Sequence, residues 1–80
     1  MTMPSYWIEG HSINVRGARV YKNDNLAASA VMRMFHIRSQ NPNDEVFLYR
    51  GATELSATFD SLVGVARYHP DGRTKEWIKK

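Results

Sequence analysis

The sequence contains no cysteine, and this absence excludes a disulfide framework and every metal site built on thiolate ligands. Cysteine-free composition is also typical of cytoplasmic proteins, so we expect a cytoplasmic location. No stretch reaches the roughly 20 consecutive apolar residues that a transmembrane helix needs, and we expect no membrane association. The first ten residues lack the basic start and the apolar run of a signal peptide.

Catalytic and metal-binding motifs are also missing. The three histidines, His11, His36 and His69, stand far apart and show none of the short spacings of a metal site. There is no glycine-rich phosphate loop and no dinucleotide fingerprint. The segment Gly10-His11-Ser12 begins like a nucleophile elbow, but Asn14 occupies the position that needs a second glycine.

Charge is unevenly distributed along the chain, whose formal net charge is +3. Residues 1–39 and 61–80 each carry five basic against two acidic side chains, whereas residues 40–60 carry one basic against four acidic. The four acidic side chains lie in a polar segment that we expect to be solvated, whereas a general acid–base pair needs a sheltered pocket; they are Asp44, Glu45, Glu54 and Asp60. The sequence therefore predicts a protein that is not an enzyme and that uses no metal or cofactor. The basic ends either steer an anionic partner or form an ordinary solvated surface.

The length of 80 residues predicts one domain, spanning residues 1–80. Without disulfides or a metal, its stability has to come from a well-packed core or from self-association, such as a homodimer. Large apolar side chains spread along the chain supply that core: Trp7, Ile8, Phe35, Phe47, Leu48, Phe59, Leu62 and Trp77.

Residues 5–22 predict a β-hairpin. Ile13 and Val15 alternate with polar neighbours, which is the period of a half-buried strand. Gly10 and Gly17 are both natural turn or bulge positions, so the turn lies either near Arg16–Gly17 or near Gly10–His11.

The clearest predicted element is an amphipathic helix that begins after one of three candidate N-caps, Asn23, Asp24 or Asn25, and ends around Ser39. Asn and Asp side chains at its start offer N-cap oxygens, and Pro42 disfavours helical backbone at the preceding residue. Apolar positions recur at helical spacing and define the face expected to pack on a sheet; that face comprises Leu26, Ala27, Ala30, Val31, Met34, Phe35 and Arg38.

The rest of the chain predicts three further β segments. Glu45–Arg50 is a short strand, and residues 63–78 form a hairpin closed by a turn at residues 69–72. Residues 52–62 fit both periods, and their Ser and Thr content favours strand or irregular structure over helix. The predicted fold class is α+β, a small antiparallel sheet with one amphipathic helix packed on one face, in the order ββα followed by a β-meander.

Two binding functions fit a chain of this kind. Basic side chains interleaved with aromatic ones on both predicted hairpins are typical of nucleic-acid binding, although no RRM, KH, zinc-finger or helix-turn-helix signature accompanies them. Protein binding is the second class, because Tyr, Trp and Arg dominate interface hot spots. The candidate aromatic anchors are Tyr6, Trp7, Tyr49, Tyr68 and Trp77, of which we expect the two tryptophans to be buried in the core.

A family resemblance favours the second class. The order of hairpin, Ala-rich helix (residues 24–35) and short strand (residues 46–49) resembles small phage-encoded inhibitors, with the nearest likeness to anti-CRISPR proteins that bind type I surveillance complexes. The resemblance covers residues 12–50 and implies a non-enzymatic protein that blocks a bacterial defence complex in the host cytoplasm. The basic net charge favours docking on an acidic protein surface over mimicry of DNA.

Our leading hypothesis from the sequence is a stoichiometric protein-binding inhibitor of mobile-element origin, whose partner is a host protein or protein complex. The alternative hypothesis is a small basic nucleic-acid-binding protein. The residues expected to form the partner interface are Arg33, His36, Arg67, Tyr68 and Arg73.

Overall fold

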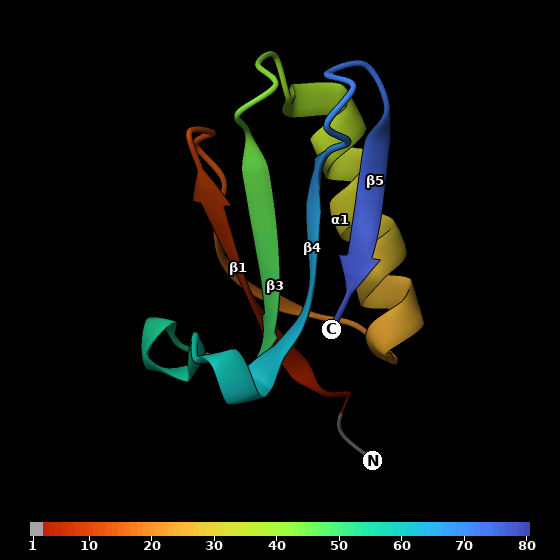
Figure 1. Ribbon diagram of the computed structural model, residues 1–80. Helices are drawn as coiled ribbons and strands as arrows, with labels where there is room; N and C mark the ends of the chain where they lie inside the picture. Colours follow the sequence, from red (N-terminus) through yellow and green to blue (C-terminus); the bar gives the residue numbers. More distant parts are fainter. Residues whose placement is uncertain (1–2) are drawn as a thin grey trace.

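A five-stranded antiparallel sheet with a helix packed on one face makes up the computed structural model, which describes residues 3–80 (Figure 1). The elements are β1 (Ser5–His11), β2 (Arg16–Val20), α1 (Asp24–Arg38), β3 (Glu45–Arg50), β4 (Leu62–Tyr68) and β5 (Lys75–Lys79). The strand order is β2-β1-β3-β4-β5, so the chain forms a hairpin, crosses the sheet through α1 and returns as a meander. The predicted α+β class and element order are confirmed.

The first hairpin turns after His11, so the second of the two predicted turn positions holds and the one near Arg16–Gly17 is wrong. Residues 12–15 form the connection and do not extend the strand, although Ile13 and Val15 have strand-like spacing. The connection folds back over Gly10, whose N–H donates to the carbonyl of Val15 at 2.6 Å. A Cβ on Gly10 would lie 2.4 Å from the carbonyl oxygen of Ile13, so only glycine allows this close approach.

The helix α1 begins and ends where its sequence predicts. The side chain of Asn23 accepts a hydrogen bond from the N–H of Leu26 at 2.9 Å, and Ser39 leaves the helix with extended backbone. Its contact face is narrower than the apolar pattern predicts. Ala27, Val31 and Phe35 are buried, whereas the side chain of Leu26 is half exposed.

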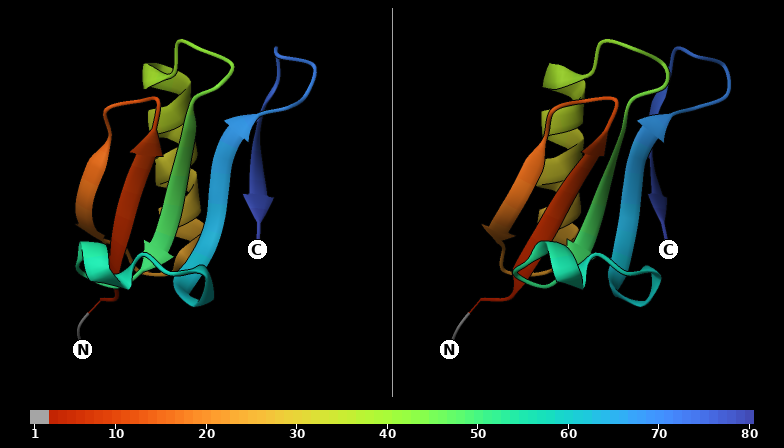
Figure 2. Two further views of the ribbon diagram at one scale, coloured as in Figure 1. Left: turned by 60° about the vertical axis from the view of Figure 1, so that its left-hand side comes forward. Right: turned by 90° about the vertical axis from the view of Figure 1, so that its left-hand side faces the viewer.

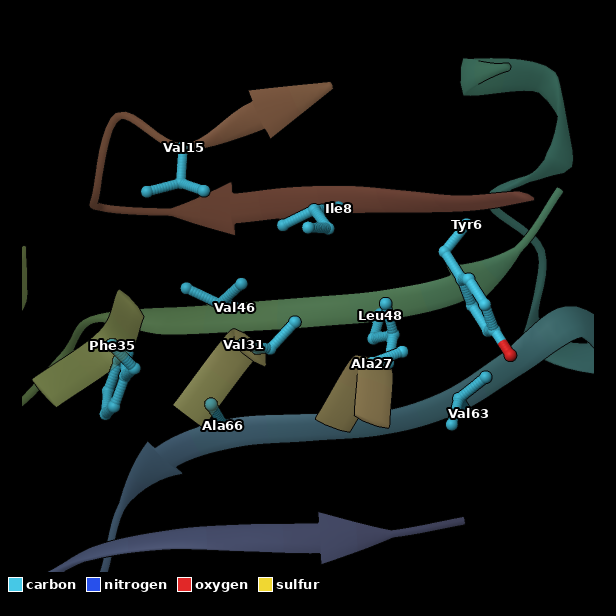
Figure 3. Close-up of a cluster of buried hydrophobic side chains, with 10 residues drawn as sticks. All are labelled: Tyr6, Ile8, Val15, Ala27, Val31, Phe35, Val46, Leu48, Val63 and Ala66. Carbon is cyan, nitrogen blue, oxygen red and sulfur yellow. The ribbon is translucent and has the colours of Figure 1, made fainter. Parts of the chain in front are cut away.

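The hydrophobic core fills the space between α1 and the sheet (Figure 3). Successive strand residues point to opposite faces, so Tyr6 and Ile8 of β1 and Val46 and Leu48 of β3 meet the helix. The remaining core side chains come from α1, β4 and the first turn; they are Val15, Ala27, Val31, Phe35, Val63 and Ala66. Trp77 packs against this core as predicted, whereas Trp7 faces the other side of the sheet.

Residues 51–61 form an irregular segment with two 3₁₀ turns, Glu54–Ser56 and Phe59–Ser61. Of the two predicted alternatives, strand and irregular structure, the second is confirmed. Figure 2 shows this segment on the side of the sheet opposite to α1, across one end of the strands. Phe59, predicted to belong to the core, is 74% exposed, because the segment passes outside the layer between helix and sheet.

The two outer strands of the sheet are β2 and β5. On β2, Nη1 of Arg19 donates a hydrogen bond of 2.8 Å to the backbone carbonyl of Ala18, the preceding residue. On β5, the side chain of Lys75 lies over the rings of Phe35 and Tyr68 and donates to the carbonyl of His36. Long basic side chains therefore line both outer strands.

Candidate functional site

One cluster of titratable groups with shifted pKa values joins β1, α1 and β3. The hydroxyl of Tyr6 donates a 2.6 Å hydrogen bond to Oδ1 of Asp24, and the guanidinium of Arg50 pairs with Oδ2. These two donors, Arg50 first, hold the pKa of the Asp24 carboxyl below its usual range. Burial, and then the hydrogen bond to Asp24, raises the pKa of Tyr6 to about 12. Because each partner satisfies the others, the cluster ties the helix to the sheet and holds no proton ready for transfer at neutral pH.

A second carboxylate, Asp44, is buried where α1 ends. Its Oδ2 accepts hydrogen bonds from the N–H groups of Gln40 and Asn41 and from the hydroxyl of Ser39, at 3.0 to 3.1 Å. Burial opposes ionisation, but the three hydrogen bonds together lower the pKa of Asp44. The carboxylate therefore fixes the chain reversal between α1 and β3.

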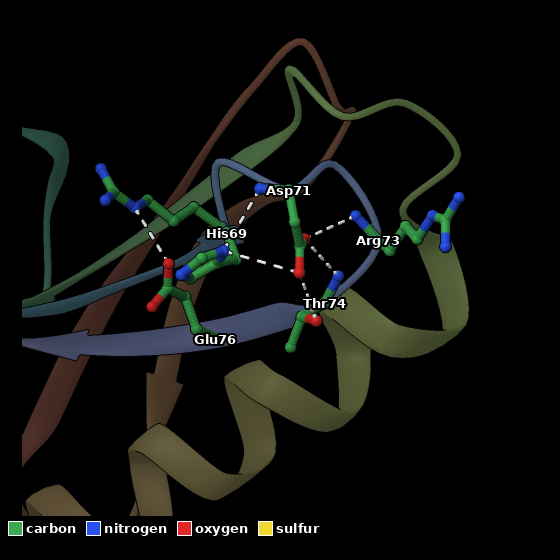
Figure 4. Close-up of polar contacts among 6 residues, drawn as sticks. His69, Asp71, Arg73, Thr74 and Glu76 are labelled. Carbon is green, nitrogen blue, oxygen red and sulfur yellow. Dashed lines mark hydrogen bonds and ion pairs between the residues drawn. The ribbon is translucent and has the colours of Figure 1, made fainter.

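The turn between β4 and β5 is built around a third carboxylate, Asp71 (Figure 4). Its Oδ1 accepts from the N–H groups of Arg73 and Thr74 at 2.8 and 2.9 Å, and its Oδ2 accepts from the Thr74 hydroxyl at 2.9 Å. These hydrogen bonds, that of the Thr74 N–H first, lower the pKa of Asp71 to about 2. The His69 ring lies beside it, with Nδ1 3.6 Å from Oδ2. The network shapes the turn and leaves the Arg73 side chain exposed.

Four of the five side chains predicted to form the partner interface lie on the two sides of the sheet, and the fifth, Arg73, is exposed on the turn between β4 and β5. Arg33 and His36 are exposed on α1. Tyr68 points to the same side of the sheet, where its ring packs edge-on against Phe35 with centroids 5.6 Å apart. Arg67 precedes it on β4 and points to the opposite face, where it pairs with Glu76 at 3.9 Å. The structure therefore brings Tyr68 near the helix residues and separates Arg67 from them.

The face of the sheet opposite to α1 carries large apolar side chains on β1 and β3, which are adjacent strands. We call this surface the open face; the pairing of the strands places on it Trp7, Glu9, His11, Arg16, Ala18, Glu45, Phe47, Tyr49, Val65, Arg67, Glu76 and Ile78. Phe47 lies at its centre, stacked with Tyr49 at 6.3 Å and tilted against His11 at 4.8 Å between ring centroids. Trp7 stands directly opposite Tyr49. Figure 2 shows α1 on the other side of the sheet and, on this side, the irregular segment across one end of the strands.

The charged groups of the open face are paired with one another. Arg16 pairs with Glu9 at 3.4 Å and with Glu54 from the irregular segment, and its guanidinium lies 5.8 Å from the centre of the Trp7 ring. The indole Nε1 of Trp7 donates to Glu9 at 3.0 Å. Three carboxylates and two guanidinium groups lie on the face, so its charge is slightly negative although the whole chain is basic.

The irregular segment adds two exposed apolar side chains beside one end of the open face. Leu55 is 91% exposed and Phe59 is 74% exposed. Both sit in a backbone held in place by the hydroxyl of Ser61, which bonds the carbonyls of Ser56 and Thr58. The segment is also tied to the sheet through the Arg16–Glu54 pair. Exposed apolar side chains on a restrained backbone are well suited to contact a protein surface.

Sequence reasoning did not identify the open face as a surface. Trp7 and Tyr49 were candidate anchors, but Trp7 was expected in the core. The predicted interface instead consisted mainly of basic side chains on α1 and the last hairpin. The signal that was present is the unbroken apolar run Tyr6-Trp7-Ile8 on β1 and Val46–Tyr49 on β3, which supplies apolar groups to both faces of the sheet.

Comparison of the chain with protein-family models, with curated proteins and with solved structures finds no match. Within residues 3–80, no group of three or more His, Asp or Glu side chains is placed to hold a metal ion. The helix found in the same range is too short and too polar to cross a membrane.

Proposed function

We propose that the protein is a non-enzymatic binding protein that acts stoichiometrically, and that it docks onto a partner protein through the open face. The observation that carries the proposal is the group of three large aromatic side chains, Trp7, Phe47 and Tyr49, at the centre of the face that α1 does not cover. A sheet with one face in water usually shows clean alternation of apolar and polar residues, whereas strands covered on both faces are apolar throughout. Helix α1 covers one face, and a partner would cover the other.

The arrangement of charges on the open face favours a protein partner over nucleic acid. Phosphate binding needs available Lys and Arg, but Arg16 and Arg67 are each paired with carboxylates of the same face. An apolar centre of Trp7, Phe47 and Tyr49 bordered by charged groups is the usual anatomy of a protein interface. We propose a partner surface with an apolar centre and a basic border, since the face itself is slightly negative.

The charge of the face changes one expectation from the sequence. The basic net charge of the chain favoured docking on an acidic surface, but the local charge of the open face favours a basic one. A second copy of this chain would bring a face of the same net negative charge opposite, so a heterologous partner fits better than a homodimer. The narrower proposal, an inhibitor of a host defence complex, rests on the resemblance of residues 12–50 alone.

The test is a tagged pull-down from bacterial lysate with and without nuclease, followed by purification of the captured protein and measurement of its affinity. We expect Phe47→Thr to weaken binding by about thirtyfold, because a central aromatic hot spot contributes about 2 kcal/mol. Thr retains strand propensity, which protects the fold.

Arg67→Glu and Arg33→Glu form a matched pair, because they make the same charge change on opposite sides of the sheet. We expect Arg67→Glu to alter affinity and Arg33→Glu to leave it within about threefold, since rim charges act modestly and remote ones hardly at all. A larger effect of Arg33→Glu than of Phe47→Thr would move the interface to the helix. Recovery of nucleic acid with no protein left after nuclease treatment, or a stable homodimer of the purified chain, would overturn the proposal.

A further inference from the structure

A cleft with a volume of about 900 Å³ opens where the first turn of α1 faces the ends of β3 and β5. It lies on the helix side of the sheet, away from the centre of the open face. The first turn of α1 and the end of β5 lie on either side of it. Its floor is apolar and includes Val63 and Trp77, and its walls carry charged side chains. A volume of this size is within the range of ligand pockets.

Basic side chains dominate the walls. Lys22, Arg50, Lys79 and Lys80 line the cleft, against two carboxylates, Asp24 and Asp60. The lining therefore holds a net charge of about +2, most of the +3 of the whole chain.

Two of these four cations form no direct ion pair within the described residues, although the charge of Lys79 helps to lower the pKa of Asp24. Arg50 is held by Asp24, and Nζ of Lys80 donates to the carbonyl of Phe59. Lys22 and Lys79 make no ion pair with any residue in the range 3–80. The helix terminus itself is not the source of attraction, since Asn23 caps it and Asp24 places a carboxylate in its first turn. The affinity for an anion would come from the two lysines.

The floor of the cleft presents an aromatic ring in a fixed position. Trp77 lies against Gly64 of β4 so closely that a Cβ at Gly64 would be 2.4 Å from Cζ2 and 2.7 Å from Cε2 of the indole. The ring is packed against the backbone of β4 and lines the cleft, so it cannot move further toward the sheet. Lysines beside a fixed indole match the pattern by which proteins bind single strands, with cations on phosphates and aromatic rings on bases.

We propose that this cleft binds single-stranded nucleic acid, with phosphates at Lys22 and Lys79 and one unstacked base against Trp77. A duplex would not fit the same description, because its bases are stacked and cannot reach the indole. The site is independent of the open face, so this activity and the binding of a protein partner can be tested separately.

The chain offers a direct spectroscopic test, because it has two tryptophans and Trp7 lies on the open face. The variant Trp7→Phe leaves Trp77 as the single indole. Titration of this variant with a ten-residue oligo(dT) at low salt is expected to quench its fluorescence to a saturating value. The logarithm of affinity should fall with the logarithm of salt concentration with a slope of about −1.4, the value for two phosphate contacts on a single strand.

Charge reversal locates the site. Lys22→Glu with Lys79→Glu, in the Trp7→Phe background, is expected to weaken oligo(dT) binding by about tenfold or more at low salt. Arg33→Glu with Arg73→Glu makes the same change in net charge on exposed side chains outside the cleft, and should weaken binding by no more than about threefold. Circular dichroism of both double variants confirms that they are folded.

Three results would overturn the proposal. One is the absence of quenching at millimolar oligo(dT) in low salt. Another is an equal loss of affinity in the two double variants, which would mean that only net charge matters. The third is equal competition by a polyglutamate peptide of the same length, which would make the cleft a site for acidic peptides.

Discussion

Replacement of Tyr6 by Phe should change how stability responds to alkaline pH. The pKa of Tyr6 is raised from 10.0 to about 12 in the folded protein, so the folded state holds the phenolic proton longer than the unfolded chain does. The stability that the protonated Tyr6 hydroxyl adds to the fold is fully present below pH 10 and is lost as the pH rises from 10 to 12. A shift of this size corresponds to at most about 3 kcal/mol, because the ring of Tyr6 is buried but its hydroxyl lies beside the 40% exposed side chain of Asp24.

At neutral pH the variant should be the less stable protein. It loses the 2.6 Å hydrogen bond from the Tyr6 hydroxyl to Asp24. Because the Asp24 side chain is 40% exposed and can be hydrated, we expect a cost of about 1–2 kcal/mol. As the pH approaches 12, the parent protein loses most of its phenolic contribution and the variant does not. The difference in free energy of unfolding should therefore shrink above pH 10 and reverse in sign near pH 12.

The assay is urea unfolding followed by far-ultraviolet circular dichroism at pH 7, 9, 10, 11 and 12. Lysines and the other tyrosines ionise in both proteins, including Tyr49, whose pKa burial also raises, so their effects cancel in the difference. A difference that stays constant between pH 9 and 12 would refute the reasoning, because it would mean that Tyr6 ionises equally easily in the folded and unfolded states.

Three further substitutions test the packing and capping arguments. Gly64→Ala should lower the free energy of unfolding by about 2–3 kcal/mol, because the added Cβ would lie 2.8 Å from the carbonyl of Ile78 and also against the indole of Trp77. It should also weaken the near-ultraviolet circular dichroism of Trp77. A loss below about 0.5 kcal/mol would show that β5 moves away from the new methyl group at little cost. Asn23→Ala should cost about 1 kcal/mol through loss of the N-cap, and Asn23→Asp, which keeps the acceptor, should restore most of it. Asp44→Ala should lower the free energy of unfolding by about 2 kcal/mol. Because the pKa of Asp44 is lowered in the folded protein, its carboxylate stabilises the fold above pH 3.8 and loses this effect as the pH falls further. The stability of the variant should therefore change less with acid pH than that of the parent. Thermal or urea unfolding measures all three.

The elements governed by local chemistry were predictable from the sequence. The helix boundaries follow from the Asn23 cap and from Pro42, and both act within a few residues. The last hairpin is likewise closed by a turn whose Asp71 bonds backbone groups two and three residues away. Each of these signals involves residues within a short stretch of sequence, so the element can be predicted without knowledge of tertiary contacts.

What the sequence did not determine is which face of each strand the helix covers. In Tyr6-Trp7-Ile8 all three side chains are apolar, so the alternation that would distinguish inside from outside is absent. The choice is made by the crossover, which places Ala27 and Val31 over Leu48 and Ala66 and leaves Trp7 on the other side of the sheet. The residues of the predicted interface lie on both sides of the sheet for the same reason, because Arg67 and Tyr68 are neighbours in sequence and point to opposite faces.

The same limit applies to the turn in the first hairpin. Ile13 and Val15 have the spacing of a strand, yet they lie in the connection because Ser12 adopts a positive φ of 63° and turns the chain back over Gly10. Val15 is nevertheless buried, so its apolar character serves the core from a loop. The spacing of apolar residues indicates which side chains are buried, so buried residues in a loop can show the same spacing as those in a strand.

The basic outer strands of the sheet have a consequence for colloidal behaviour. An unpaired strand edge is a template on which further chains can add, and a protein with an apolar open face is exposed to that hazard. Here β2 carries Arg19, which covers the carbonyl of Ala18, and β5 carries Lys75 and Lys79. Two copies approaching edge to edge would bring like charges together at either end. The cations on the outer strands therefore oppose growth of the sheet into fibres while leaving its open face accessible.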